Sequence, residues 1–243
     1  MRTRISRGLA AALAVSALSL TAACGGGAKD DAKKDGADKP AAGATTSAAP
    51  TSEAPATPLT AAQMKAGLLE LKDLPSGWKA SKAEDDDTVY KADKPECAPI
   101  ADLMSGKLDG GTEGGEAGFS MGNNDSEIDE ATATFPGTGA ADFTKKIGTA
   151  LESCTGFTTE VEGSQWKITL TKLTAPQGVE EAHAFVAAIE VAPGMKIEPN
   201  VFVARQGTGV LRFLHLADAA TAKKDFPTLS KLATDKFAKA AQG

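Results

Sequence analysis

Positive charge is scarce in this chain, which has 26 lysine and arginine residues against 32 aspartate and glutamate residues. Three arginines lie within the first seven positions, so 23 basic residues face the same 32 acidic ones in the rest of the chain. Surfaces that bind nucleic acid or anionic lipid are rich in lysine and arginine. The composition therefore argues against both kinds of partner for the folded part.

Several catalytic and cofactor-binding motifs are also missing. The chain has no His-Glu-x-x-His helix, no phosphate-binding loop and no dinucleotide fingerprint. The two histidines, His183 and His215, each lie in a predicted strand beside apolar residues, which favours a structural role over a general base. The acidic run at residues 84–87 lacks the spacing of a calcium loop. We therefore expect no catalytic residues, no cofactor and no metal site.

One apolar run stands out, and it lies at the start of the chain. Arg2, Arg4 and Arg7 precede an apolar stretch at residues 9–20, which is too short to span a bilayer and ends in small residues before Cys24. No other apolar stretch approaches the length of a membrane span. The pattern predicts a signal peptide over residues 1–23 and export of the chain.

The end of this signal resembles the lipobox of bacterial lipoproteins, in which a leucine and two small residues precede a lipidated cysteine. Here Thr21 stands where the leucine is usual, and Leu20 lies one place earlier. The resemblance implies a diacylglyceryl group on Cys24 and anchoring at the extracellular face of the cell membrane. An ordinary secretory signal that happens to contain a cysteine is the alternative.

A linker follows Cys24 and completes the predicted segment 24–58. Residues 25–58 contain no Leu, Ile, Val, Met, Phe, Tyr or Trp, so they have no apolar surface to offset the entropy of ordering. We expect a disordered tether with a root-mean-square reach of about 30 Å. Residues 59–243 are long enough for one domain with its own core.

Two cysteines remain in this domain, and the predicted export places them in an oxidising compartment. Cys97 precedes apolar residues at helical spacing, and Cys154 follows a second such run, so both sulfurs lie on apolar helix faces. We predict a Cys97–Cys154 disulfide, which the chain-entropy model credits with about 4 kcal/mol for a loop of this length. Two separate thiols are the alternative.

Helices are predicted at both ends of the domain and strands between them. Thr60 and Gln63 form a capping box, and Met64, Leu68 and Leu71 form one apolar face of the first helix. Further helices are expected at residues 97–104 and 140–151, and a closing helix is expected to be interrupted near Pro227.

Alternating apolar and polar residues at 166–173 predict a half-buried antiparallel strand, with residues 182–191 as its neighbour. Residues 201–206 and 209–216 flank Gly207-Thr208, which suits a hairpin turn. The resulting fold class is α+β, with one mainly antiparallel sheet packed against helices in a single domain after a disordered tether.

The order of these features resembles the actinobacterial surface lipoproteins related to the extracellular sensor domain of PknH-type kinases. The shared order is a lipobox, an Ala/Thr/Pro-rich tether, a helix ending in a Leu-Pro-x-Gly-Trp turn, two helix-borne cysteines, a late hairpin and a closing helix. The likeness covers residues 60–240. It implies a sheet with a solvent-facing cleft for a ligand and no catalytic residues. Those sensor domains usually carry two disulfides, whereas this domain can form one.

Arg205 and Arg212 are the only arginines after Arg7, and both lie on the predicted hairpin. With Gly207-Thr208 as the turn, Val203 lies opposite Arg212 and Arg205 lies diagonal to it, so both guanidinium groups project from one face. Such a pair can clamp a carboxylate or another anionic group. Solvated arginines at a hairpin tip are the competing interpretation.

These observations favour a monomeric, non-enzymatic surface lipoprotein, attached to the membrane through Cys24. Its sensor-like domain is expected to bind an unknown small ligand or an envelope protein. A carrier of lipid or another small apolar molecule is the alternative, and an envelope hydrolase is the third possibility.

Overall fold

The computed structural model of this chain describes residues 57–82, 88–123 and 125–243. The predicted signal peptide, Cys24, most of the predicted linker and the acidic run at residues 84–87 lie outside the described residues. These expectations therefore stay predictions. The fold below is that of the described part.

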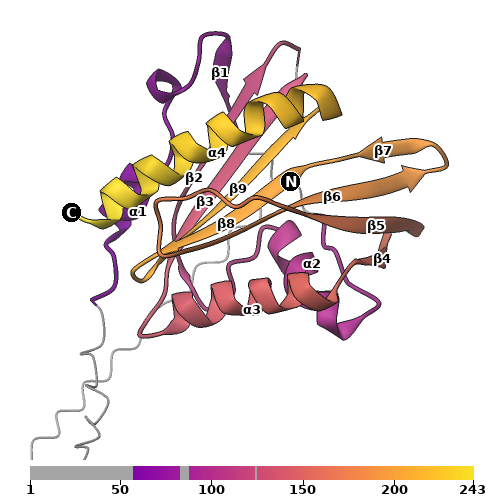
Figure 1. Ribbon diagram of the computed structural model, residues 1–243, viewed down its shortest axis with the longest axis horizontal. Helices are drawn as coiled ribbons and strands as arrows, with labels where there is room; N and C mark the ends of the chain where they lie inside the picture. The colour runs from indigo at the N-terminus through magenta and orange to yellow at the C-terminus, as the bar shows by residue number, and fades with distance from the viewer. Residues whose placement is uncertain (1–56, 83–87, 124) are drawn as a thin grey trace, which may run out of the picture. The chain divides into compact units, whose positions relative to one another are not determined.

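Among the described residues, nine strands form one sheet in which every pairing is antiparallel (Figure 1). Eight strands lie in the order β1-β2-β3-β9-β8-β6-β5-β4, and β7 pairs with β6. The strands are β1 (Trp78–Ser81), β2 (Thr112–Met121), β3 (Ser126–Thr134), β4 (Gly156–Val161), β5 (Ser164–Leu173), β6 (Glu181–Ala192), β7 (Met195–Ile197), β8 (Asn200–Gln206) and β9 (Gly209–Ala217). The predicted α+β class with one antiparallel sheet is confirmed.

Helices cover both faces of this sheet, so its central strands are buried on both sides. The helical segments are α1 (Ala61–Ala66), η1 (Leu71–Asp73), η2 (Pro95–Cys97), α2 (Ala98–Met104), α3 (Gly139–Ser153) and α4 (Ala219–Ala241). In β8, Val201 and Val203 belong to one apolar cluster, whereas Phe202 and Ala204 belong to a second. Alternate side chains of a strand point to opposite faces, so the two clusters lie on opposite sides of the sheet.

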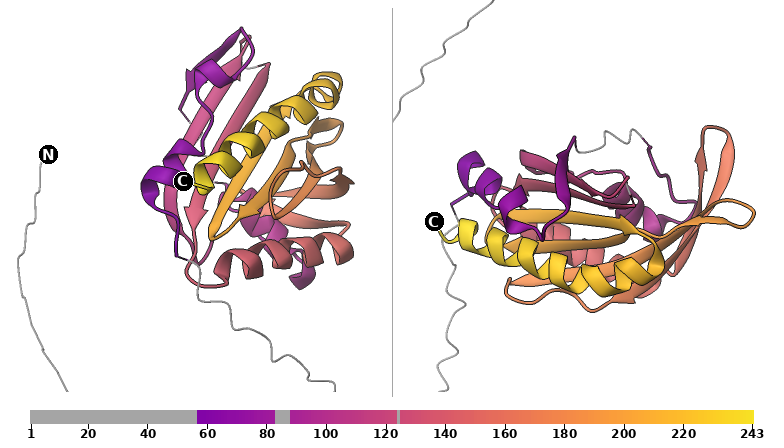
Figure 2. Two further views of the ribbon diagram at one scale, coloured as in Figure 1. Left: turned by 60° about the vertical axis from the view of Figure 1, so that its left-hand side comes forward. Right: turned by 90° about the horizontal axis from the view of Figure 1, so that it is seen from above.

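The first face packs against α1 and α4. Phe202 and Phe213 stack with ring centroids 4.9 Å apart, and Phe226 of α4 lies 6.3 Å from each ring. Asp218 caps α4 by accepting hydrogen bonds from the next two free backbone N–H groups, those of Ala220 and Thr221. Figure 2 shows α1 beside the C-terminal end of α4.

The second face packs against α2 and α3, and a disulfide joins the segments that carry these helices. Cys97 and Cys154 are bonded, with their Cα atoms 5.2 Å apart, and both residues are buried. Ile147 of α3 and Ile100 of α2 belong to the same apolar cluster as the two cysteines. The bond therefore links the start of α2 to the end of α3, as the helical spacing predicts.

Leu59 joins the start of the domain to the turn between β8 and β9. Its backbone N–H donates a 2.8 Å hydrogen bond to Oγ1 of Thr208, a residue that is almost completely buried. The capping box predicted at Thr60 and Gln63 is present immediately afterwards. The segment that enters the domain is thus fixed against the centre of the sheet.

Two local predictions are wrong. The first helix ends at Ala66, and the chain turns into η1, so Leu71 is 45% exposed instead of continuing the face of Met64 and Leu68. Pro227 does not interrupt the closing helix, because α4 is continuous from Ala219 to Ala241. A single proline removes one N–H group, and burial of Phe226, Leu229 and other residues of α4 offsets that loss.

None of the described helices is long and apolar enough to cross a bilayer. α4 has the length, but its lysines and aspartates alternate with the buried face of the helix.

Candidate functional site

The β8–β9 hairpin places the two arginines as the sequence predicts, but both contact protein acceptors. Val203 pairs with Arg212 across the strands, and Gly207 in the turn has a φ of 57°. Arg212 donates from Nε to the carbonyl oxygen of Leu103 at a distance of 3.1 Å. Its guanidinium therefore holds the second-last residue of α2, and the anion clamp stays a prediction.

Arg205 forms ion pairs with two consecutive glutamates. Its Nη1 bonds to Glu180, and its Nε lies 3.4 Å from Oε2 of Glu181. Glu180 also accepts a hydrogen bond from the backbone N–H of Gly207. These contacts fasten the turn after β8 to the start of β6.

Glu181 in turn links α3 to His183. The hydroxyl of Thr144 on α3 donates to Oε2 of Glu181 at 2.7 Å, and Nε2 of His183 lies 3.1 Å from Oε1. Partial burial raises the pKa of Glu181, but the hydrogen bonds from Thr144 and His183 outweigh it and leave the pKa below its usual range. An ionised carboxylate only accepts hydrogen bonds, so Nε2 of His183 carries a proton.

A glycine on α3 makes room for this imidazole. A Cβ atom at Gly148 would lie 2.5 Å from Cε1 and 2.7 Å from Nε2 of His183. Glycine lowers the stability of a helix interior by about 1 kcal/mol relative to alanine. Its presence here lets α3 approach β6 closely enough for Thr144 to reach Glu181.

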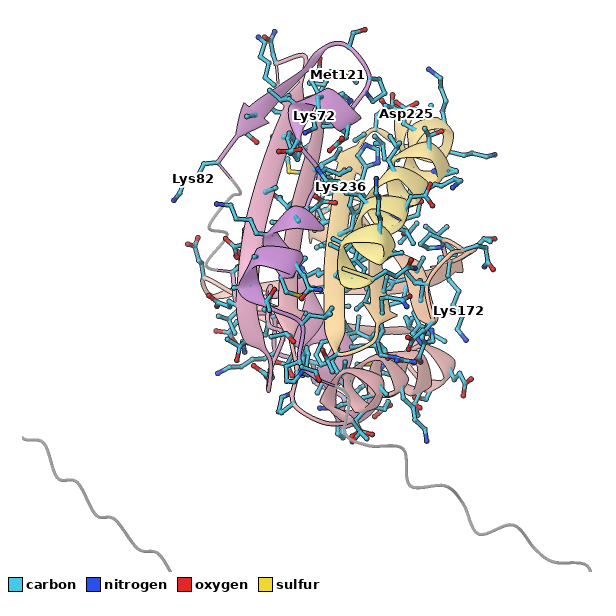
Figure 3. The ribbon with its side chains drawn as sticks, turned by 90° about the vertical axis from the view of Figure 1, so that its left-hand side faces the viewer. Lys72, Lys82, Met121, Lys172, Asp225 and Lys236 are labelled. Carbon is cyan, nitrogen blue, oxygen red and sulfur yellow. A yellow bond between two sulfur atoms is a disulfide. The ribbon has the colours of Figure 1, made fainter. Side chains whose placement is uncertain are left out.

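A hollow of about 300 Å³ opens beside this cluster, between α3, the end of β5 and the start of β6; we call it the α3 pocket. Lys145 and Glu152 line it from α3, Lys172 lines it from β5, and Glu181 and His183 form part of its wall. Figure 3 shows Lys172 on the side of the sheet where α3 lies, whereas Lys236 and Asp225 belong to α4. This volume is at the lower end of the range for small-molecule sites.

Two lysines of the α3 pocket are uncommitted. Lys145 and Lys172 form no ion pair or hydrogen bond with any other residue that the structure describes. Leu151 of α3 gives the lining an apolar side chain, whereas the side chains of Leu173, Ala175 and Ala182 pack against the apolar cluster on the α4 face. The pocket therefore combines ammonium groups that no described residue pairs with, an oriented imidazole and an apolar side chain from α3.

A larger groove of about 580 Å³ lies on the other face, between η1 and α4, and most of its charged side chains are paired. Lys236 of α4 lies 3.1 Å from Oε2 of Glu70 and 2.5 Å from Oδ2 of Asp73, and Lys72 pairs with Glu70. The ion pairs hold the segment after α1 against α4. Lys239 is the one charged residue of this lining without a partner among the described residues.

Glu130 of β3 lies buried beneath that segment. Its Oε2 accepts a 2.8 Å hydrogen bond from the backbone N–H of Leu69, while Oε1 has no partner among the described residues. Burial raises the pKa of Glu130 to about 8, although the Leu69 hydrogen bond and nearby Lys236 act in the opposite direction. Glu130 is therefore largely protonated at neutral pH.

His215 forms a buried hydrogen bond with Ser126, a residue far from it in the sequence. Its Nε2 lies 2.9 Å from Oγ of Ser126, both residues are almost completely buried, and Nδ1 has no partner among the described residues. Burial lowers the pKa of His215 to about 4, so its imidazole is neutral at pH 7. A serine–histidine pair without solvent access and without an orienting carboxylate lacks two features of a hydrolase site.

Gly118-Phe119-Ser120-Met121-Gly122 matches the Gly-x-Ser-x-Gly spacing of a nucleophile elbow, a match that our sequence analysis missed. The structure places Ser120 within β2, where it pairs with Lys79 and Glu127. A nucleophile elbow needs a sharp turn from a strand into a helix. The match therefore has no catalytic geometry.

The described residues contain no group of three or more histidine, cysteine, aspartate or glutamate side chains placed to hold a metal ion. No pattern in the sequence indicated the α3 pocket, because Lys145, Lys172 and His183 are separated by 11 residues or more. Their proximity arises from the crossing of α3 over β6.

Comparison with known proteins gives likeness in structure alone. No protein-family model and no curated protein matches the chain. The extracellular domain of PknH from Mycobacterium tuberculosis matches 76% of this chain and 98% of its own length, at 16% identity and a TM-score of 0.55. An uncharacterised protein from Mycobacterium smegmatis matches 76% of this chain and 96% of its own at 12% identity, with a TM-score of 0.41. The predicted resemblance to the PknH extracellular domain is thus confirmed at the level of the fold.

Proposed function

We propose that this chain is a non-enzymatic, cell-surface lipoprotein whose domain binds a small ligand in the α3 pocket. The observation that carries the proposal is the pocket itself, where two lysines that have no partner among the described residues and an oriented imidazole border one hollow. Groups that are held in place but not satisfied by the protein are typical of a binding site.

The location rests on separate observations. The charged start, the short apolar run and Cys24 support export and lipid attachment. The fold likeness to an extracellular domain is consistent with a place outside the cell. A lipid anchor and a linker would leave the domain near the outer face of the membrane, where it can meet ligands of the envelope.

The arrangement of polar groups supports binding over catalysis. Ser126 and His215 are closed off from solvent, and Ser120 lies inside strand β2, paired on both sides. At the α3 pocket, the ring of His183 bonds to Glu181, and no serine, threonine or cysteine nucleophile among the described residues bonds to that ring. A nucleophile hydrogen-bonded to its base is the usual signature of covalent catalysis.

The proposal is tested by native mass spectrometry of the whole chain, purified gently from membranes and then incubated with an extract of envelope metabolites. We expect a bound small molecule on the wild-type protein and its loss from Thr149→Phe, which fills the pocket from α3. Lys146→Phe is the matched control, because residue 146 lies on α3 outside the pocket lining. A wild-type protein that takes up nothing overturns the proposal, and a bound lipid that survives Thr149→Phe supports the carrier alternative instead.

A further inference from the structure

We infer that the α3 pocket binds the phosphate group of a small phosphate ester, through Lys145, Lys172 and His183. This inference rests on the proposed function and names the chemical class of its ligand. Lysine binds phosphate as a mobile point charge, and two lysines from different elements can reach one group from two sides.

The charges at the pocket favour an anion once their existing partners are counted. Glu181 is occupied by Thr144, His183 and Arg205, so its carboxylate already has three donors. Glu152 is the one other carboxylate in the lining. The lining also has two lysines, Lys145 and Lys172, which have no acceptor among the described residues. Their two positive charges exceed the single negative charge of Glu152.

His183 adds a polar ring whose position is set before the ligand arrives. Glu181 holds Nε2, and α3 passes directly over the ring at Gly148. With Nε2 already used, Nδ1 is the nitrogen left for a ligand, and the side chain is 27% exposed. With the ring proton on Nε2, Nδ1 accepts a hydrogen bond, which the P–OH group of a monoprotonated phosphate ester can donate.

The shape of the pocket sets the size of the ligand. About 300 Å³ holds a phosphate group and a small organic body, and Leu151 of α3 offers that body an apolar contact. The same phosphate chemistry occurs in soluble esters and in lipid headgroups. The experiment below separates the two sources.

The two histidines of the chain make a direct test possible. Their environments differ, because His215 is 0% exposed and His183 borders the pocket. We would label histidine ring carbons in the whole chain and titrate it with inorganic phosphate, with chloride as the ionic-strength control. Saturable movement of the His183 signals, with His215 unchanged, is expected; the His183→Gln variant identifies the signals.

Charge-matched variants locate the binding site. Lys145→Gln and Lys172→Gln should each weaken phosphate binding by about tenfold, which corresponds to the loss of one charge-assisted contact. Lys146→Gln and Lys167→Gln remove the same charge from the same helix and strand outside the lining, and they should leave binding unchanged. Equal weakening by all four variants would reveal general electrostatics and overturn the inference.

Competition identifies the source of the phosphate. Displacement of phosphate by glycerol 3-phosphate supports a soluble ester, and displacement only by vesicles that contain phosphatidic acid supports a headgroup. If neither glycerol 3-phosphate nor the vesicles displace the bound phosphate, it is an adventitious ion only. This result overturns the inference. If phosphate fails to bind while native mass spectrometry finds another ligand, the phosphate inference fails and the proposed function stands.

Discussion

Gly148 and His183 are in direct contact across the boundary between α3 and β6, and a Cβ atom at position 148 would lie 2.5 Å from the imidazole. We predict that Gly148→Ala displaces the ring and breaks its bond to Glu181. Alanine gains about 1 kcal/mol in helix propensity, which partly offsets the lost contact. The expected result is a small change in stability with at least about tenfold weaker phosphate binding.

The NMR signals of the His183 ring report its displacement, and calorimetric titration measures the loss of phosphate affinity. A double-mutant cycle with His183→Ala supplies the control, because a smaller side chain removes the clash and the two changes should then be strongly non-additive. Additive effects would mean that the two residues act independently.

Glu130 should make the protein less stable as pH rises. Its pKa is raised to about 8 in the folded state, so between about pH 4.5 and 8 the unfolded chain is ionised while the folded chain keeps the proton. Unfolding then releases a proton, and the free energy of unfolding falls with rising pH by about 3–5 kcal/mol in total before levelling above pH 8. Glu130→Gln should remove this slope, as measured by urea unfolding at a series of pH values.

The slope due to Glu130 is best measured between about pH 6.5 and 8.5. Below about pH 6.5, His215 changes the free energy of unfolding with pH in the opposite direction. The pKa of His215 is lowered to about 4, so its stabilising effect is lost as pH falls from about 6.5 through 4. Glu113→Gln, an exposed change on β2, is the control. A slope that persists unchanged in Glu130→Gln would contradict the buried, protonated carboxyl.

Reduction of the Cys97–Cys154 bond should lower the free energy of unfolding by about 4 kcal/mol, because the reduced chain gains the entropy of an open 57-residue loop. Both cysteines should resist alkylation in the native protein until a reductant is added. The Cys97→Ala/Cys154→Ala double variant should unfold at a lower urea concentration than the oxidised protein. Two freely alkylated thiols in the exported protein would exclude the bond.

The same phosphate titration distinguishes the roles of the two hairpin arginines, Arg205 and Arg212. Arg205→Ala leaves Glu180 and Glu181 without their cation, so we expect weaker binding through a displaced His183. Arg212→Ala should leave phosphate affinity unchanged and cost about 1 kcal/mol of stability, since the Leu103 carbonyl loses one of its donors and keeps the N–H of Gly106. A loss of about tenfold or more in both variants would instead support the direct arginine clamp.

Cys24 is predicted to carry the lipid. Cells fed a palmitate analogue should label the protein and hold it in the membrane fraction, because acyl chains at one residue contribute about 0.8 kcal/mol per buried methylene. Cys24→Ser should lose both label and membrane retention. Equal labelling of the variant would rule out this residue as the attachment point.

Short-range sequence patterns predicted where helices and strands occur better than where each of them ends. Gly207-Thr208 and the flanking apolar residues indicated the β8–β9 hairpin and the pairing of Val203 with Arg212. Leu71 was misplaced because the apolar spacing continues past Gly67, where the segment instead turns to bury Leu68 and Leu69. Tertiary packing determines where α1 ends, and the helical periodicity of apolar residues does not reveal that packing.

The candidate site was less accessible to sequence reasoning than the fold. Arg205 was noticed because arginines are rare, yet its partners Glu180 and Glu181 belong to β6 and the residue before it, which pair with β8 only in the folded sheet. Lys145 and Lys172 look like ordinary solvated lysines in the sequence. Only the crossing of α3 over β6 brings them to one hollow.

The hydrogen bond from Leu59 to Thr208 has a mechanical consequence. Tension applied to the chain ahead of Leu59 is transmitted first to the β8–β9 turn, at the centre of the sheet, where Thr208 also accepts from the backbone N–H of Phe135. Such a load shears a buried junction between three segments instead of peeling an edge strand away. A domain held to a moving surface by its N-terminal end would therefore resist pulling at one of its best-packed points.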